Sequence, residues 1–285
     1  MMKTTFLNLA APKVPGSMAQ TVISCLKKQS NCDEVPKTEF TKLIKEDSFS
    51  SHFFTFFQLD HLSISDFLVA WTHKSICHEY KNLFPFSYER LEFLGDSILN
   101  FYVTQKLYKR YPEKKEGELS KLRSELVSGV ELSVLSELIG LDHFVILGVG
   151  ELKNKSYSNK SILADIFEST LAVILLKDGP EMCWRFLDQC LNIYYEKNNE
   201  HYFDEKRLVG RDSKGRLQEY TMKKYNCLPK YCSKELPNGH HEVSLYINDD
   251  LYDVEVANSK KLAEKQAAQI TLQKFLGNTG DQNAH

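Results

Sequence analysis

The sequence lacks several features that would assign it to particular classes of protein. No apolar run approaches the roughly 18–20 residues that a membrane-spanning helix needs. None of the seven cysteines forms a C-x-x-C pair, so no zinc site is indicated and a reducing compartment is expected. Residues 1–32 have no acidic residue, but they also lack arginine and a continuous apolar core, which argues against a signal peptide. We therefore expect a cytoplasmic protein without a membrane partner; an organelle or, for a viral protein, the host cytoplasm is the alternative.

The composition is that of an ordinary globular chain with no large excess of either charge. The 285 residues are enough for two domains of about 100–200 residues each. There are 36 Lys+Arg and 38 Asp+Glu, which give a formal net charge of −2. Residues 46–212 hold 19 basic and 26 acidic side chains, a net −7, whereas 1–45 carry +4 and 213–285 carry +1. The acidity lies in the middle of the chain, so the total charge alone does not exclude a nucleic-acid partner.

Hydrophobic periodicity divides the chain into a helical part and a mixed part. From about residue 60 to 195 apolar residues recur at helical spacing, with no strand alternation. The helices expected there span 64–73, 88–110, 118–139, 159–177 and 180–197. Beyond them the pattern predicts a helix, three strands and a helix, at 213–225, 229–236, 241–248, 251–257 and 259–276. An all-α domain followed by a small α+β domain is therefore expected.

These patterns give an expected domain organisation of five segments. In chain order they are a loosely ordered N-terminal extension with a short helix near 18–28, an all-α domain, a polar linker, the α+β domain and a tail, at 1–45, 46–197, 198–211, 212–277 and 278–285.

Acidic side chains interrupt two of the apolar helices in an unusual way. Glu89, Glu92 and Asp96 fall on one stripe of the helix expected at 88–110. Asp165 and Glu168 fall on one face of the helix expected at 159–177. Like charges in apolar surroundings destabilise a fold unless a cation intervenes. Oxygen ligands without Cys or His suit Mg²⁺ or Mn²⁺ better than zinc. Spacing thus predicts an acidic metal site between helices; the alternative is that these acids lie on solvated helix faces.

Several ordered motifs in the same region resemble those of the ribonuclease III family. The central one is ERLEFLGDSIL at 89–99, preceded by THKS at 72–75 and followed by EGELSKLR at 116–123, LGVGE at 147–151 and SILADIFES at 161–169. They cover roughly residues 60–195 in the family's order and spacing. Independently, roughly residues 212–277 resemble a double-stranded-RNA-binding domain. The resemblance implies the ribonuclease III catalytic fold followed by the α-β-β-β-α fold of that domain.

The resemblance also implies an activity and a set of site residues. Enzymes of this family hydrolyse phosphodiesters of double-stranded RNA with Mg²⁺, or Mn²⁺ in its place, and leave 5′-phosphate and 3′-hydroxyl ends with two-nucleotide 3′ overhangs. The metal-binding positions of the family fall here on Glu92, Asp96, Asp165 and Glu168. Its two further active-site acids match Glu89 and Glu116, and we expect Asp96 and Glu168 to be the indispensable pair.

The same resemblance implies a homodimer and a set of RNA contacts. A Phe that enters the partner subunit in this family matches Phe93, whereas residue pattern alone favours an ordinary core position for this side chain. The RNA-binding positions of the second domain match two residues of its first helix, one loop residue and the basic start of its last helix: Gln218, Glu219, His241, Lys260, Lys261 and Lys265. A helix N-terminus with lysines is an anion site, and duplex RNA is recognised by shape and backbone.

The sequence departs from the family patterns at a few positions. Glu264 stands where the RNA-binding motif usually has a lysine. The net charge of +1 for residues 213–285 is low for such a domain, so modest, salt-sensitive RNA affinity is expected. Residues 155–159 replace a Gly-Gly and an Arg that often precede SILAD, and Tyr88 stands where an Asn usually precedes the first Glu. None of these changes removes an acid.

Two other classes of function compete with an active nuclease. A non-catalytic RNA-binding scaffold would have lost some of the acids, and all six are present. A protein-interaction module in place of the RNA-binding domain would have lost Lys260, Lys261 and His241, which are also present.

Overall fold

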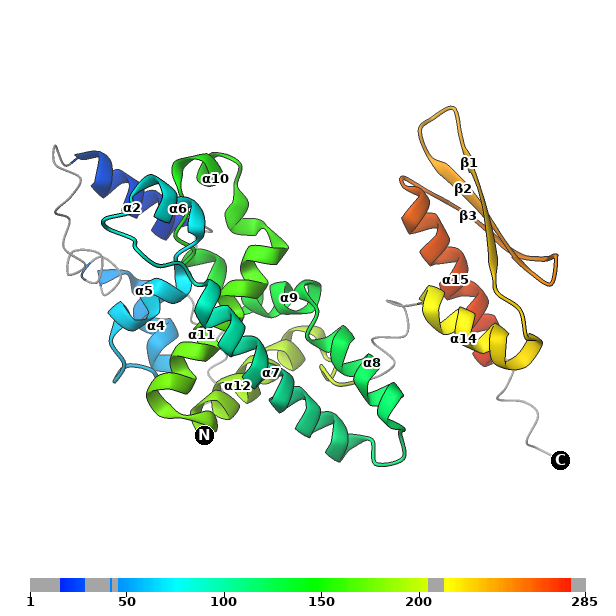
Figure 1. The fold of residues 1–285 in the computed structure, drawn as a ribbon, viewed down its shortest axis with the longest axis horizontal. Coiled ribbons are helices and arrows are strands. Elements are labelled where there is room, and N and C mark those ends of the chain that lie inside the picture. Colours follow the sequence, from blue (N-terminus) through cyan, green and yellow to red (C-terminus); the bar gives the residue numbers. More distant parts are fainter. Residues whose placement is uncertain (1–15, 29–41, 43–45, 205–212, 278–285) are drawn as a thin grey trace. The chain divides into compact units, whose positions relative to one another are not determined.

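The computed structural model describes residues 16–28, 42, 46–204 and 213–277 (Figure 1). The chain forms two compact units, Met1–Phe203 and Asp204–His285. Half of the expected linker, all of the tail and most of the expected N-terminal extension lie outside the described residues. None of the described helices is both long and apolar enough to cross a bilayer.

The first unit is helical, as the periodicity predicts. Its principal helices are α2 Ser17–Lys28, α4 Ser48–Phe56, α5 Ile64–Trp71, α6 Lys74–Glu79, α7 Glu89–Arg110, α8 Glu116–Leu126, α9 Gly129–Ile139, α10 Val149–Lys153, α11 Lys160–Asp178 and α12 Pro180–Asn198. Two short 3₁₀ turns, Leu141–His143 and Ser156–Ser158, connect some of them.

Helix α11 lies at the centre of this unit, where it packs against α5, α7, α9 and α12. It is apolar nearly all round, which is the pattern of a buried helix. Every residue from Ile162 to Ile174 is buried except Asp165. Beside it, the rings of Trp71 and Phe144 stack with centroids 4.3 Å apart. The indole Nε1 of Trp71 donates to Thr170 on α11 at 3.1 Å, so this buried polar atom is satisfied.

The predicted single helix at 118–139 is wrong: the chain forms α8 and α9 instead. Ser128 between them has an extended backbone, with φ −64° and ψ 148°. Ser and Gly are weak helix formers, and the Ser128-Gly129 pair occurs where apolar periodicity continues on both sides. Periodicity therefore did not reveal the break.

Parts of the expected extension and linker pack against the helical unit. The expected short helix near 18–28 is present as α2, and its Met18, Val22 and Ile23 are buried. At the other end Tyr202 is 4% exposed, and its hydroxyl donates to the Leu126 carbonyl at 2.7 Å. The helical unit thus extends beyond residue 197 as far as Phe203.

The second unit has the expected helix–three strands–helix order: α14 Ser213–Tyr225, β1 Lys230–Glu235, β2 His241–Ile247, β3 Asp250–Ala257 and α15 Lys260–Gly277. The strands form one antiparallel sheet in the order β1-β2-β3, with Val243 opposite Ser233 and Glu255. Both helices pack on one face, over a core of Leu217, Leu245, Ile247, Ala267, Ala268 and Leu272. The predicted fold class, an all-α domain followed by an α+β domain, is confirmed.

Strand β3 shows that alternation locates a strand without telling which face is buried. Val254 and Val256 are 44% and 46% exposed. Asp253, which precedes Val254, is directed to the helices, where its carboxylate pairs with Lys274 of α15 at 3.1 Å.

Candidate functional site

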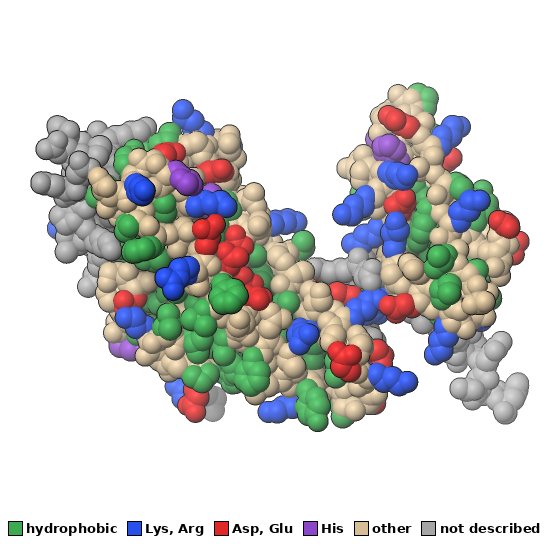
Figure 2. All heavy atoms as spheres, in the orientation of Figure 1, with side chains coloured by type: hydrophobic (Ala, Val, Ile, Leu, Met, Phe, Trp, Pro, Cys, Tyr) green, Lys and Arg blue, Asp and Glu red, His purple; other side chains and the backbone are tan. Residues whose placement is uncertain are grey.

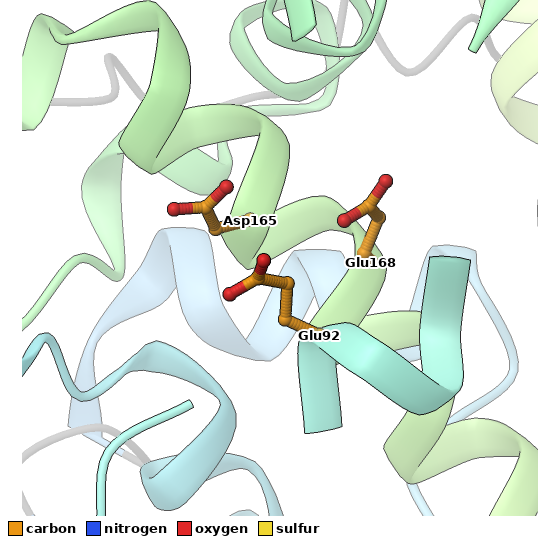
Figure 3. A group of neighbouring side chains, drawn as sticks. All are labelled: Glu92, Asp165 and Glu168. Atoms are coloured by element: carbon orange, nitrogen blue, oxygen red, sulfur yellow. The ribbon is translucent and has the colours of Figure 1, made fainter. Parts of the chain in front are cut away.

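Three carboxylates from two helices converge on one point of the helical unit. Glu92 comes from α7, and Asp165 and Glu168 come from α11 (Figure 3). One oxygen of each lies within 4.8 Å of the others. The i, i+3 spacing on α11 places Asp165 and Glu168 on one face, and the close packing of α7 against α11 brings Glu92 to them.

A glycine allows this close approach of the two helices. Gly95 is buried in the middle of α7, and a Cβ at this position would overlap the carbonyl oxygen of Glu168. Gly inside a helix costs about 1 kcal/mol relative to Ala, so its presence here has a packing reason. A larger residue at position 95 would hold α7 away from α11 beside the carboxylate cluster.

Burial and mutual repulsion raise the pKa values of the three carboxylates. Burial is the larger cause at Glu168, and the charges of Asp96, Glu92 and Asp165 add to it, raising the Glu168 pKa to about 8. Burial and then the Asp165 charge raise the pKa of Glu92. Burial also raises the pKa of Asp165, although a hydrogen bond from Tyr88 and the charge of Lys74 oppose it. The cluster is an arrangement that a bound cation would stabilise.

The raised pKa of Glu168 predicts how pH affects the stability of the metal-free protein. Between pH 4.5 and about 8 the folded chain keeps a proton on Glu168 that the unfolded chain has lost. The free energy of unfolding in EDTA should therefore fall as pH rises through this window, by on the order of a few kcal/mol. Thermal melts near pH 5 and near pH 8 measure this change, and Glu168→Gln should make it smaller. If the stability of Glu168→Gln changed with pH as much as that of the native chain, the pKa of Glu168 would not be raised.

The other acids expected at the site are placed differently. Asp96 is exposed, one turn from Glu92, and its carboxylate accepts a hydrogen bond from Asn100 at 2.6 Å. Its charge acts on Glu168, so it borders the cluster. Glu89 is exposed and pairs with Lys74 at 3.4 Å. Glu116 is not brought to the cluster: it starts α8 and lines a separate hollow with Lys114 and Arg123.

The donor set fits a hard divalent cation. All three clustered ligands are carboxylate oxygens, and within the described residues no Cys or His joins them. Mg²⁺ and Mn²⁺ prefer such oxygen ligands and commonly take only a few from the protein. In Figure 2, acidic side chains gather on one face of the helical unit, with Lys and Arg side chains around them. This surface suits a negatively charged ligand only when a cation offsets the acids.

Phe93 is not a core residue. Its side chain is 77% exposed on α7, and Phe86 and Leu176 of the same unit are 64% and 62% exposed. Phe86 and Leu176 line a hollow of about 540 Å³ whose walls also include Leu91, Leu94 and Val173. An exposed aromatic side chain and an apolar hollow on the same unit are the two halves that a self-complementary contact requires.

The expected RNA-binding residues all lie in the second unit. Gln218 and Glu219 are exposed on α14, and His241 is half-buried at the first residue of β2. Lys260 and Lys261 are exposed in the first turn of α15, where Ser259 accepts a hydrogen bond from the Leu262 backbone. Lys265 follows one turn later and is half-buried.

Glu264 is neutralised inside the second unit. Its carboxylate pairs with Lys214 of α14 at 2.8 Å, and its side chain is only 14% exposed. The ammonium of Lys214 also lies 4.6 Å from the centre of the Tyr231 ring. Glu264 therefore links α14 and α15, and the charge of Lys214 largely offsets its own.

The sequence analysis assigned no role to three residues that shape the carboxylate cluster. Gly95 lets the helices touch, Lys74 places a positive charge near the acids, and Tyr88 donates a hydrogen bond to Asp165 at 3.0 Å. A glycine within an apolar helix was a usable signal, because it often marks a close backbone approach. The roles of Lys74 and Tyr88 depend on contacts between segments far apart in the chain.

Comparison with known proteins identifies the family of each domain. Residues 89–179 match the Ribonuclease III domain, and residues 213–275 match the Double-stranded RNA binding motif. The chain is 37% identical to Ribonuclease 3 of Borreliella burgdorferi, over 75% of this chain and 88% of that relative. It is 35% identical to Ribonuclease 3 of Nitrosococcus oceani, over 75% and 89%. The crystallised nuclease domain of ribonuclease III from Campylobacter jejuni is 28% identical, with a TM-score of 0.45, over 52% of this chain and 97% of that one. The chain therefore belongs to the ribonuclease III family, with a nuclease domain followed by a double-stranded-RNA-binding domain.

Proposed function

We propose that this protein is a Mg²⁺-dependent endonuclease that cuts both strands of double-stranded RNA, with Mn²⁺ able to replace Mg²⁺. The observation that carries the proposal is the convergence of Glu92, Asp165 and Glu168 within 4.8 Å of one another, in the nuclease domain of a chain with an RNA-binding domain. The products are short duplexes with 5′-phosphate and 3′-hydroxyl ends and two-nucleotide 3′ overhangs, as the family resemblance implies.

The residues of the cluster would hold the cation and create the electrostatic environment of the reaction. Glu92, Asp165 and Glu168 would supply oxygen ligands, with Asp96 at the border of the site. When bound, the divalent ion supplies activation of a water molecule and offsets the charge that builds up on the phosphate. Glu89 and Glu116 are proposed as further active-site acids. Glu116 stands apart from the cluster within one chain, so its part in the reaction requires another element to bring it near the RNA.

The experiment that tests the proposal is cleavage of a perfect RNA duplex by the full chain. With Mg²⁺, short duplexes should accumulate, and sequencing of their ends should show the overhang and the end groups. A DNA duplex of the same sequence and an EDTA-treated sample should remain intact. Failure to cut with both Mg²⁺ and Mn²⁺ would overturn the proposal and favour a non-catalytic RNA-binding scaffold.

We further propose that the active form is a homodimer in which Phe93 enters the apolar hollow of the partner. A two-fold contact would bury the exposed ring of each chain in the hollow lined by Phe86 and Leu176 of the other. Such a dimer presents two carboxylate clusters to one duplex, so that each cuts one strand.

Truncation of Phe93 should weaken this dimer strongly. A central aromatic residue of an interface contributes at least about 2 kcal/mol, so Phe93→Ala should raise the dimer dissociation constant by roughly thirtyfold or more. Sedimentation at a series of protein concentrations measures the constant. Leu251→Ala, which removes an exposed apolar side chain (56%) from the other domain, is the matched control. Equal dissociation constants for the Phe93 variant and the native chain would contradict this interface.

The lysines at the start of α15 are proposed to hold RNA phosphates. Double substitution Lys260→Ala with Lys261→Ala should weaken duplex binding and reduce the slope of log affinity against log salt by about two, since each phosphate contact contributes about one. Binding titrations at several salt concentrations measure the slope. Lys230 and Lys234 of β1 are also exposed and provide the control pair. An unchanged slope would show that Lys260 and Lys261 do not touch phosphate.

A further inference from the structure

Tyr88 connects the beginning of α7 with a carboxylate of α11. Its side chain is only 4% exposed, its ring lies 5.8 Å from that of His73, and its backbone N–H donates to the Thr72 carbonyl at 3.0 Å. Its hydroxyl donates to Oδ2 of Asp165 at 3.0 Å. The tyrosine is therefore anchored by both its backbone and its ring, so the position of its hydroxyl is well defined.

Among the clustered acids, only Asp165 receives a hydrogen bond from the described part of the chain. The carboxylates of Glu92 and Glu168 accept none there. Lys74, whose charge acts on Asp165, pairs with Glu89 at 3.4 Å and does not hydrogen-bond to Asp165. Within the described residues, the Tyr88 hydroxyl is thus the only group whose hydrogen bond sets the orientation of the Asp165 carboxylate.

We propose that Tyr88 is a positioning residue that orients Asp165 for a divalent cation. The inference rests on the proposed function, because it assigns a role at the same cation site. An ionised carboxylate has about four acceptor sites, so one hydrogen bond to Oδ2 leaves the remaining sites available to a cation. Hydrogen bonds to metal-binding carboxylates set their orientation and typically change metal affinity by about 10–100-fold. The Tyr88 hydroxyl carries no charge, so it can orient the Asp165 carboxylate without neutralising the negative charge that would attract a cation.

The chain offers a matched control for this hydroxyl. Tyr102 is also buried, at 2% exposed, and its hydroxyl donates to the Asp188 carboxylate at 2.5 Å, outside the cluster. Tyr88→Phe and Tyr102→Phe each remove one part-buried tyrosine–carboxylate hydrogen bond and keep the ring. Both should lower the melting temperature, but only the first should affect the cation site.

The experiment is calorimetric titration of the full chain with Mn²⁺ in the absence of RNA, at a temperature where circular dichroism shows all variants folded. Tyr88→Phe should bind Mn²⁺ about 10–100-fold more weakly than the native chain, and half-maximal RNA cleavage should need correspondingly more cation. Tyr102→Phe should bind as the native chain does. If Tyr88→Phe also binds as the native chain does, the positioning role is wrong and the proposed function stands. If the native chain binds no Mn²⁺, the proposed cation site fails, and the role of Tyr88 fails with it.

Discussion

Replacing Glu168 with Gln is expected to slow cleavage of duplex RNA by roughly a thousandfold or more while leaving RNA binding nearly unchanged. The change keeps the shape of the side chain but removes a charged oxygen ligand from the proposed cation site. A divalent cation contributes several kcal/mol to such a reaction, and each 1.36 kcal/mol is a factor of ten in rate. Single-turnover cleavage and a binding titration with the same duplex measure the two effects separately.

The same substitution should make the metal-free protein more stable near pH 8. It removes one buried, mutually repelling carboxylate, whose pKa the surroundings raise to about 8. Glu181→Gln, at an exposed position in the first turn of α12, makes the same change away from the cluster. It should leave the rate unchanged and should lower stability by no more than about 1 kcal/mol, through the lost interaction with the helix dipole. A Glu168→Gln protein that cuts RNA at the native rate would exclude Glu168 from the reaction.

Replacing Gly95 with Ala is expected to destabilise the nuclease domain by about 3 kcal/mol or more and to abolish cleavage. The added Cβ would overlap the backbone of Glu168, so α7 and α11 would have to separate. Overpacking of a well-packed interior typically costs about 1–3 kcal/mol, and here the obstacle is backbone, which yields less than a side chain. The displaced backbone belongs to a cluster residue, so the proposed cation site would be distorted as well.

Gly117→Ala is the matched control for the effect of the extra methyl group. Gly117 lies on α8, and a Cβ there would meet no atom within 4 Å. Ala is the better helix former by about 1 kcal/mol, so this variant should be as stable as the native chain or more so. Chemical denaturation of both variants measures the difference. If Gly95→Ala were as stable as Gly117→Ala, the close contact of α7 and α11 would not exist.

The sequence was most informative where acidic residues interrupt apolar helices. Acids within apolar helices, as at Glu92 and Glu168, predicted a shared metal site, and the structure brings these carboxylates together with Asp165. Apolar periodicity and strand alternation predicted the fold class. Both signals are local, because they depend on spacings within one helix or one strand.

Features that depend on contacts between distant segments could not be predicted in the same way. The hydrogen bond from Tyr88 to Asp165 joins residues far apart in the chain, and so does the overlap that constrains Gly95. The exposure of Phe93 likewise contradicts what residue type alone favours, since a large apolar side chain in a helix is usually buried. Glu116 carries the expected residue type, yet its position apart from the cluster follows from the direction of α8 and not from its identity.

The most direct test of the central claim is to locate the cation. Anomalous diffraction from crystals grown with Mn²⁺ should show a peak at about 2.0–2.3 Å from carboxylate oxygens of Glu92, Asp165 and Glu168, the distance range of metal–oxygen ligation. This peak should be absent from crystals of Glu168→Gln. A Mn²⁺ peak elsewhere in the nuclease domain, with none among these three carboxylates, would contradict the account.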